Sequence, residues 1–405
     1  MSTVITGIGA ATPNGLGVEA FWKATLAGRS GIGELTGFDV SKYPSRLAGR
    51  ITDFDAAEHL PSRLLPQTDV STRYALAVAA WALLDADVDE ESLPDYDMGT
   101  VTANALGGFE FTHREFHKLW SKGPQYVSVY ESFAWFYAVN TGQISIRHKL
   151  RGPSAALVGE QAGGLDAIGH ARRTVRRGTG LVVCGGVDSA FDPWGWAAQL
   201  AGGRVSTATD PAAAYLPFDE RASGHVPGEG GAILVVEDAE VARRRGAPQV
   251  YGEIAGYAST FDPKPGSDRE PGLRRAAELA LADAGLAPGD VDVVFADAAG
   301  LADLDRDEAR ALREVFGPRG VPVSVPKTLT GRMYAGGGPA DVVTALLSMR
   351  DGVIPACGNS TRVPQEYGID LVTGEPRTRR VRSALVLARG RWGFNSAVVV
   401  TRDGD

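Results

Sequence analysis

The stretch Pro153-Ser154-Ala155-Ala156-Leu157-Val158-Gly159-Glu160-Gln161-Ala162-Gly163-Gly164 decides how the rest of the chain is interpreted. It predicts a short apolar strand, a tight turn at Gly159 and a helix that opens on small residues. Such a turn points the side chain of Gln161 into a cavity at a helix N-terminus, where the helix dipole would favour a thiolate. Glutamine offers an amide donor and acceptor, but it cannot ionise or attack a thioester.

Outward from this stretch, apolar strand-like runs alternate with helical segments, which predicts a layered α/β architecture. A polar run at 243–248 interrupts the alternation and is the best candidate for a boundary. We therefore expect two related halves, residues 1–246 and 247–405. Helices are predicted at 20–27, 71–86 and 273–284, and strands at 4–7, 181–186, 232–237, 249–256, 291–296, 384–388 and 396–400.

Composition limits the classes of function. The 405 residues are 44% hydrophobic and 22% charged, as in an ordinary globular protein with a sizeable core. The net charge of −8 argues against nucleic acid as a partner. There is no run of 18 apolar residues and no basic and apolar leader, so we expect a cytoplasmic protein without membrane contact.

Two further motifs point away from cofactors. Cys184 and Cys357 are the only cysteines, which argues against a disulfide framework or a zinc site. Gly7-x-Gly9 lacks the third glycine of a dinucleotide-binding loop, because Thr12 stands there, and a tight turn explains the glycines better. We expect neither a metal nor a cofactor.

Several motifs together resemble the beta-ketoacyl synthase family. They are the Gln161 turn, Phe218-Asp219-x-Arg221-x-x-Gly224-x-x-x-Gly228-Glu229-Gly230, the segments 296–308 and 327–331, and Gly390-x-x-Gly393-Phe394-Asn395-Ser396. They cover nearly the whole chain in the expected order. The resemblance implies the thiolase fold, a dimer whose subunits stack two duplicated βαβαβαββ halves as a five-layer α-β-α-β-α sandwich.

The chain departs from that family at every catalytic position. A working ketosynthase needs a nucleophilic cysteine and two histidines that stabilise an oxyanion and a developing enolate. Here those positions hold Gln161, Asp297 and Arg332, and none of the six histidines falls on them. A carboxylate at Asp297 would repel an enolate. No condensing activity of its own is expected, so whether the chain counts as an enzyme stays open.

Other family positions are retained, namely Asp305, Glu308 and Lys327. They fit either a relic of the catalytic network or a structural ion pair, Lys327 with Glu308, that braces the core. The structural interpretation is favoured. Losing one partner of such a buried pair would typically cost about 3–5 kcal/mol, because the other charge is left unpaired.

A glutamine in the cysteine position has two meanings among relatives of this family. One is a malonyl decarboxylase that primes polyketide assembly, and the other is the chain-length factor, or ketosynthase-beta, of bacterial aromatic type II polyketide synthases. Decarboxylation still needs both histidines, so Asp297 and Arg332 favour the chain-length factor, particularly its actinorhodin-type members. The resemblance then implies a heterodimer with a ketosynthase-alpha subunit, served by an acyl carrier protein.

A predicted helix over residues 107–120 places Phe109, Thr112, Phe116 and Trp120 on one face. Spacing alone suggests an ordinary core stripe. The resemblance to chain-length factors implies instead that Phe109, Thr112 and Phe116 gate the tunnel that sets polyketide length. Two bulky phenylalanines suggest a short tunnel and an octaketide product.

Two surface segments are candidates for partner contact. The aromatic segment 126–137 is expected at the subunit interface, with Phe133, Trp135 and Tyr137 as its contact residues. The cluster Arg172-Arg173-x-x-Arg176-Arg177 could meet an acidic carrier protein, although cations near a helix C-terminus are equally explained by the helix dipole.

Overall fold

The strands form one connected path whose two halves repeat the same topology. The computed structural model describes residues 2–89, 91–94 and 96–402. Within these, the first half runs β1-β8-β7-β5-β6 and the second β9-β16-β15-β10-β11-β13. In each half the far strands are parallel and the last two are antiparallel to their neighbours. The halves join at a short pairing of Val4 and Ile5 with Glu253 and Gly252.

The repeated order confirms the predicted duplication. The strands of the first half are β1 (Thr3–Thr12), β5 (Met98–Ala103), β6 (Ser154–Leu157), β7 (Leu181–Asp188) and β8 (Gly230–Asp238). Those of the second are β9 (Gly252–Phe261), β10 (Val293–Phe295), β11 (Pro322–Ser324), β13 (Asp370–Leu371), β15 (Ser383–Arg389) and β16 (Phe394–Thr401). Short pairs complete the set: β2 (Gly15–Leu16) on β1, β3 (Ile32–Glu34) with β4 (Leu47–Gly49), and β12 (Val353–Ile354) with β14 (Arg377–Thr378).

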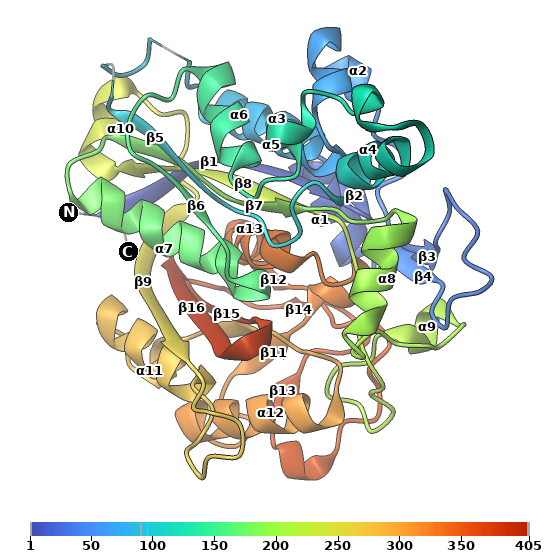
Figure 1. Ribbon diagram of the computed structural model, residues 1–405. Coiled ribbons are helices and arrows are strands. Elements are labelled where there is room, and N and C mark those ends of the chain that lie inside the picture. Colours follow the sequence, from blue (N-terminus) through green and yellow to red (C-terminus); the bar gives the residue numbers. More distant parts are fainter. Residues whose placement is uncertain (1, 90, 95, 403–405) are drawn as a thin grey trace.

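Helices separate and cover the two halves of the sheet (Figure 1). Two of them, α7 (Gly163–Arg176) and α13 (Gly337–Asp351), lie in the middle layer and contact strands of both halves. The outer layers include α3 (Val70–Asp85) and α6 (Val139–His148) on one side, and α11 (Leu273–Ala284) and α12 (Ala302–Phe316) on the other. The order α-β-α-β-α is the thiolase-type sandwich that the family resemblance implied.

Sequence patterns explain these layers. Strands β7 and β8 read as continuous apolar runs because both of their faces are covered by helices. Helix α13 is buried along almost its whole length and therefore lacks a polar face. In α7, a side chain at Gly169 would lie 2.4 Å from the Tyr257 ring of β9, so glycine permits this close approach.

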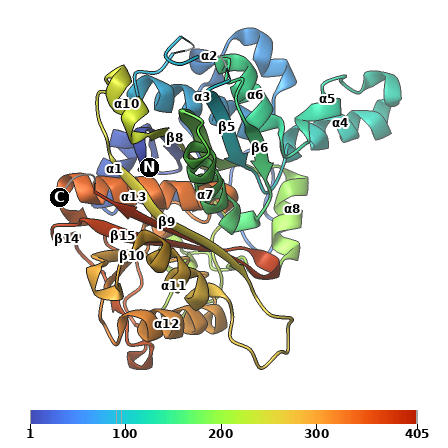
Figure 2. The same cartoon turned by 90° about the vertical axis from the view of Figure 1, so that its left-hand side faces the viewer.

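One helical unit stands out from the body. Helices α4 (Phe109–Lys122) and α5 (Glu131–Ala134) project to one side (Figure 2), and α4 contacts α8 (Pro193–Ala201). The predicted helix at 107–120 is thus confirmed, with its start at Phe109 after two glycines. Over the described part of the chain, no helix has the length and apolar character needed to span a membrane.

Candidate functional site

The predicted strand, turn and helix around Gln161 are present. Strand β6 leads through Gly159 to Glu160, whose φ of 51° lies in the left-handed region, and α7 begins at Gly163. A non-glycine residue in this region is strained, so it must be held by its neighbours. The Glu160 carboxylate accepts hydrogen bonds from the backbone N–H groups of Gln161 (3.2 Å) and Arg391 (2.5 Å). The turn therefore fixes Gln161, which is buried, against the wall of a cavity.

Asp297 and Arg332, the other two altered positions, form a buried ion pair beside that cavity. Arg332 Nη2 donates to Asp297 Oδ1 at 2.8 Å, and Arg332 Nη1 donates to the Asp297 carbonyl at 2.6 Å. The backbone N–H of Arg389 also donates to Asp297 Oδ1 (2.8 Å), and the Arg389 side chain lies 3.8 Å from Oδ2. Gln161, Asp297 and Arg332 are thus brought together around one cavity, as the family resemblance implied.

The surrounding positive charges keep the Asp297–Arg332 pair ionised. Burial opposes ionisation of Asp297, but the positive charges of Arg332, Arg389 and Lys327 outweigh burial and lower the pKa of the Asp297 carboxyl. A fixed negative charge and a fixed guanidinium therefore fill the space where a condensing site needs two imidazoles. An enolate formed there would meet the Asp297 carboxylate, which destabilises it.

The prediction of an ion pair between Lys327 and Glu308 is wrong. Lys327 Nζ lies 2.6 Å from Asp341 Oδ2 on α13 and donates to the Ala296 carbonyl at 2.5 Å. Glu308 instead accepts from the backbone N–H groups of Asp297 and Ala298, both at 2.8 Å. Lys327 still braces the core, but it does so against the middle helix layer rather than against α12.

Glu308 and Asp305 act together as anchors for strained backbone. Asp305 accepts from the N–H groups of Phe218 (2.9 Å) and Gly300 (3.0 Å). Phe218 and Ala298 have φ values of 57° and 53°, so both need such restraint. Burial raises the pKa of Asp305 to about 7. These retained acids thus shape the loop that carries Asp297.

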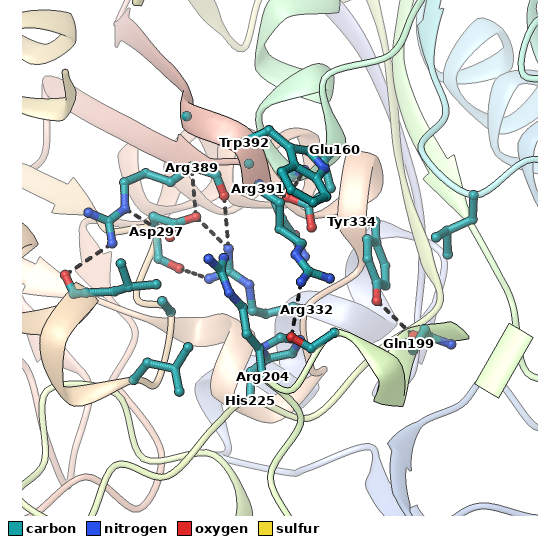
Figure 3. Close-up of a pocket in the computed structure, with 18 of the residues that line it drawn as sticks. Glu160, Gln199, Arg204, His225, Asp297, Arg332, Tyr334, Arg389, Arg391 and Trp392 are labelled. Atoms are coloured by element: carbon teal, nitrogen blue, oxygen red, sulfur yellow. Dashed lines mark hydrogen bonds and ion pairs between the residues drawn. The ribbon is translucent and has the colours of Figure 1, made fainter. Parts of the chain in front are cut away.

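The cavity beside Gln161 has a volume of about 280 Å³. Figure 3 shows side chains from distant parts of the sequence pointing into it, including Arg204, His225 and Arg391. Burial, followed by the charge of Arg332, lowers the pKa of His225 to about 3, so this imidazole is neutral. Tyr334 donates from its hydroxyl to Gln199 at 3.0 Å on the far wall. The altered site therefore keeps an open cavity beside Gln161.

A second cavity of about 400 Å³ lies against the inner face of α4. Phe109, Thr112 and Phe116 line it, and the Trp194 ring packs against Phe109 (4.9 Å between centroids) and Phe116 (6.0 Å). Both phenylalanines are half-buried, whereas Trp120 is 77% exposed. Phe109 also lines the first cavity, together with Leu106, so the two spaces share a wall.

The aromatic segment on and around α5 is partly exposed. Trp135 and Phe136 are each 47% exposed and Tyr137 is 37% exposed, while Phe133 is half-buried. Large apolar groups gathered on a projecting unit are typical of protein contacts.

The basic cluster of α7 is not a continuous surface patch. Arg172 is buried, lies 2.6 Å from Asp283 of α11 and donates to the Ala255 carbonyl at 2.5 Å. It therefore ties the middle layer to the outer one, and Arg173, Arg176 and Arg177 remain exposed. Both cysteines are buried; burial raises the pKa of Cys357 to about 12 and that of Cys184 further, so neither is a nucleophile.

Sequence reasoning missed several residues that line these cavities. Trp194, which lines the second cavity, and Arg204, which lines the first, lie in no motif that predicts a site. Arg391 lies within the Gly390-x-x-Gly393 turn and lines the first cavity. The glycines of this turn predict a family motif, but the motif does not specify the arginine between them. Glu131 lines the second cavity at the start of α5. The one sequence signal for these cavity residues was the position of a charged residue, Arg391, between two turn glycines.

Fold and site together define a ketosynthase-like scaffold whose three catalytic positions hold Gln161, Asp297 and Arg332. The family model described as beta-ketoacyl synthase, N-terminal domain, matches residues 2–242, and the C-terminal domain model matches residues 251–361. The chain belongs to the beta-ketoacyl synthase family.

Its relatives narrow the class to ketosynthase-beta subunits, which confirms the resemblance seen in the sequence. It is 70% identical over 402 residues, 99% of each chain, to "Actinorhodin polyketide putative beta-ketoacyl synthase 2" of Streptomyces coelicolor. It is 58% identical over 402 residues to the "Tetracenomycin polyketide synthase ketoacyl synthase beta subunit" of Streptomyces glaucescens, covering 99% of this chain and 98% of the relative. Among solved structures, "The ishigamide ketosynthase/chain length factor" superposes with a TM-score of 0.89 at 25% identity, over 100% of this chain and 99% of that one.

Proposed function

We propose that this chain is the catalytically silent, chain-length-determining subunit of a type II polyketide synthase, paired with a ketosynthase-alpha subunit. The observation that carries the proposal is the buried Asp297–Arg332 pair at 2.8 Å beside Gln161. A condensing site needs a nucleophile and two neutral or protonatable imidazoles, and this one holds an amide and a locked ion pair. The partner then supplies the cysteine, and an acyl carrier protein supplies the malonyl units.

The same pair argues against the alternative, a glutamine-type malonyl decarboxylase. Loss of carbon dioxide leaves an enolate that needs hydrogen-bond donors where its charge develops. The Arg332 guanidinium donates its hydrogen bonds to the Asp297 carboxylate and to the carbonyls of residues 297 and 298. The Asp297 charge opposes the enolate, so decarboxylation on this chain is disfavoured.

Length control is proposed for the second cavity. Phe109, Thr112 and Phe116 stand along one face of α4, and Phe109 to Phe116 spans about 10 Å along the helix axis. That span is comparable to several ketide units. Because Phe109 lies in the wall between the two cavities and Phe116 lies farther along α4, we expect these two rings to stop the growing chain, and we propose an octaketide product.

The partner interface is proposed on the projecting unit of α4 and α5, with Phe133, Trp135 and Tyr137 as contact residues. An obligate interface of this kind buries about 2,000–5,000 Å² and is largely apolar. The exposed aromatic groups are the apolar surface that such an interface needs. We place the boundary between the two halves at residues 246 and 247, after the left-handed Gly246 that ends α10 (Ala239–Arg245), and the working location in the cytoplasm.

Co-expression with a ketosynthase-alpha partner tests the assembly. The chain should co-purify with the partner as a heterodimer, and Trp135→Glu should dissociate it, because the charge would be buried unpaired. Leu84→Glu is the matched control, since Leu84 is 79% exposed at the far end of α3. A monomer in the presence of partner, or equal behaviour of the two variants, would contradict the proposed interface.

A further inference from the structure

Two arginines face the cavity beside Gln161 without a carboxylate partner. Arg204 and Arg391 both line it and point into it (Figure 3). Arg391 Nη2 donates to the Gly202 carbonyl at 3.1 Å, and its guanidinium lies 5.5 Å from the Trp392 ring. Within the described residues, neither guanidinium forms an ion pair with an acid. Two like charges thus share one pocket, and the Glu160 carboxylate of the same wall only partly offsets their repulsion.

The acids of the same wall are already engaged. Glu160 accepts from two backbone N–H groups of the turn and of the 390–393 loop. The remaining wall carboxylates bond to groups other than these two arginines: Asp297 to Arg332, Asp262 to Asn395 (2.7 Å) and the N–H of Gly272 (2.7 Å), and Asp307 to Arg310 (3.0 Å).

The electrostatic field at Arg204 agrees with this geometry. Burial comes first and the guanidinium of Arg391 second among the causes that lower the pKa of Arg204, and the charges of Arg332 and Arg389 act in the same direction. The Glu160 carboxylate opposes them but does not offset their sum. An arriving anion would therefore be attracted by several guanidinium groups at once.

The pocket also has room for an organic chain. Its volume of about 280 Å³ extends from the two arginines to Gln161. Much of the rest of the wall is uncharged, and it includes the apolar side chains of Leu106, Ala198, Leu301, Leu304 and Trp392. A ligand with an anionic group at the two arginines and a short uncharged chain toward Gln161 would match both ends of the cavity.

We propose that the degenerate active-site cavity binds an organic anion, whose phosphate monoester or carboxylate head lies between Arg204 and Arg391. Guanidinium groups bind both heads through paired, charge-assisted hydrogen bonds. The site belongs to this chain's own residues, so the inference stands apart from the proposed pairing and length control. The proposed ligand would occupy a cavity whose catalytic positions are altered.

Calorimetric titration of the full-length chain, alone or with the partner that co-purifies, tests the inference at constant ionic strength. The probes are butyl phosphate, pentanoate and 1-pentanol, which share a short chain and differ in the head. At least one anion should bind saturably and be displaced by inorganic phosphate or acetate, and 1-pentanol should not bind. Tighter binding of butyl phosphate assigns a phosphate monoester, and tighter binding of pentanoate assigns a carboxylate.

Variants locate the binding. Arg204→Ala/Arg391→Ala should weaken the anion at least ten-fold, and Arg204→Gln/Arg391→Gln, which keeps more of the side-chain volume, should do the same. Arg176→Ala/Arg177→Ala removes the same net charge from an exposed helix end and should leave affinity unchanged. Equal affinity in all variants, or binding of neither anion to the wild-type chain, would overturn the proposal whatever the outcome of co-purification.

Discussion

Replacing Phe109 and Phe116 by alanine, in the heterodimer with a ketosynthase-alpha partner, should lengthen the polyketide. Both rings line the cavity of about 400 Å³ and pack on Trp194, at 4.9 and 6.0 Å between centroids. Truncating them removes the wall shared with the first cavity and the stop farther along α4. Each CH₂ of substrate that gains burial there recovers about 0.8 kcal/mol, and less for carbonyls without partners.

The stability cost separates a tunnel wall from a packed core. A packed Phe→Ala change costs about 3–5 kcal/mol. Phe109 and Phe116 are half-buried and already border empty space, so each truncation should cost less than a packed core change. The loss includes part of the ring's burial and its pairing with Trp194, about 0.5–1.5 kcal/mol for each ring, and Phe116 also loses its pairing with Trp120 (5.2 Å between centroids). Phe111 is the control, because it lies on the same helix with only 1% of its surface exposed. Phe111→Ala should destabilise by the full core amount and leave product length unchanged.

Mass spectrometry of the products, with malonyl-loaded carrier protein as substrate, gives the answer. Phe109→Ala/Phe116→Ala should add one or more acetate units while turnover continues, with a small decrease in melting temperature. Unchanged product length together with a decrease in melting temperature as large as that of Phe111→Ala would show that Phe109 and Phe116 belong to an ordinary packed core.

Two further predictions concern the degenerate site. Asp297→Ala or Arg332→Met alone should each destabilise by about 3–5 kcal/mol, and the double variant by clearly less than their sum; additive effects in urea denaturation would mean the pair is not coupled. His225 has a pKa of about 3 when folded and near 6.5 when unfolded, so its stability contribution is complete above pH 6.5 and decreases by up to about 1.4 kcal/mol per pH unit on acidification toward pH 3. His225→Gln should therefore show a shallower loss of urea midpoint between pH 6.5 and 4.5, and an identical pH dependence would contradict a buried neutral imidazole.

The altered catalytic positions could be found because the chain resembles the beta-ketoacyl synthase family, whose catalytic residues lie in short motifs with fixed spacing. Gln161, Asp297 and Arg332 are fixed by the glycines and small residues around them, and the fold then brings them to one cavity. The α4 stripe could be found because helical periodicity puts Phe109 and Phe116 on one face.

Partners of buried charges could not be found in this way. Helix α13 is buried on all sides, so its sequence carries no periodicity to show that Asp341 faces Lys327. Arg172 precedes arginines that are exposed, and only the packing of α11 shows that it reaches Asp283. Which residues meet across layers depends on the stacking of the two halves, and local patterns do not contain that information.

The most direct test of catalytic silence is intact-mass spectrometry of the heterodimer after incubation with acyl-loaded carrier protein. Acyl transfer needs a nucleophile, and the Gln161 amide is not one, whereas the proposed ketosynthase-alpha partner would supply a cysteine. We expect an acyl mass increase on the ketosynthase-alpha subunit and none on this chain. A covalent acyl adduct on any residue of this chain would contradict this expectation.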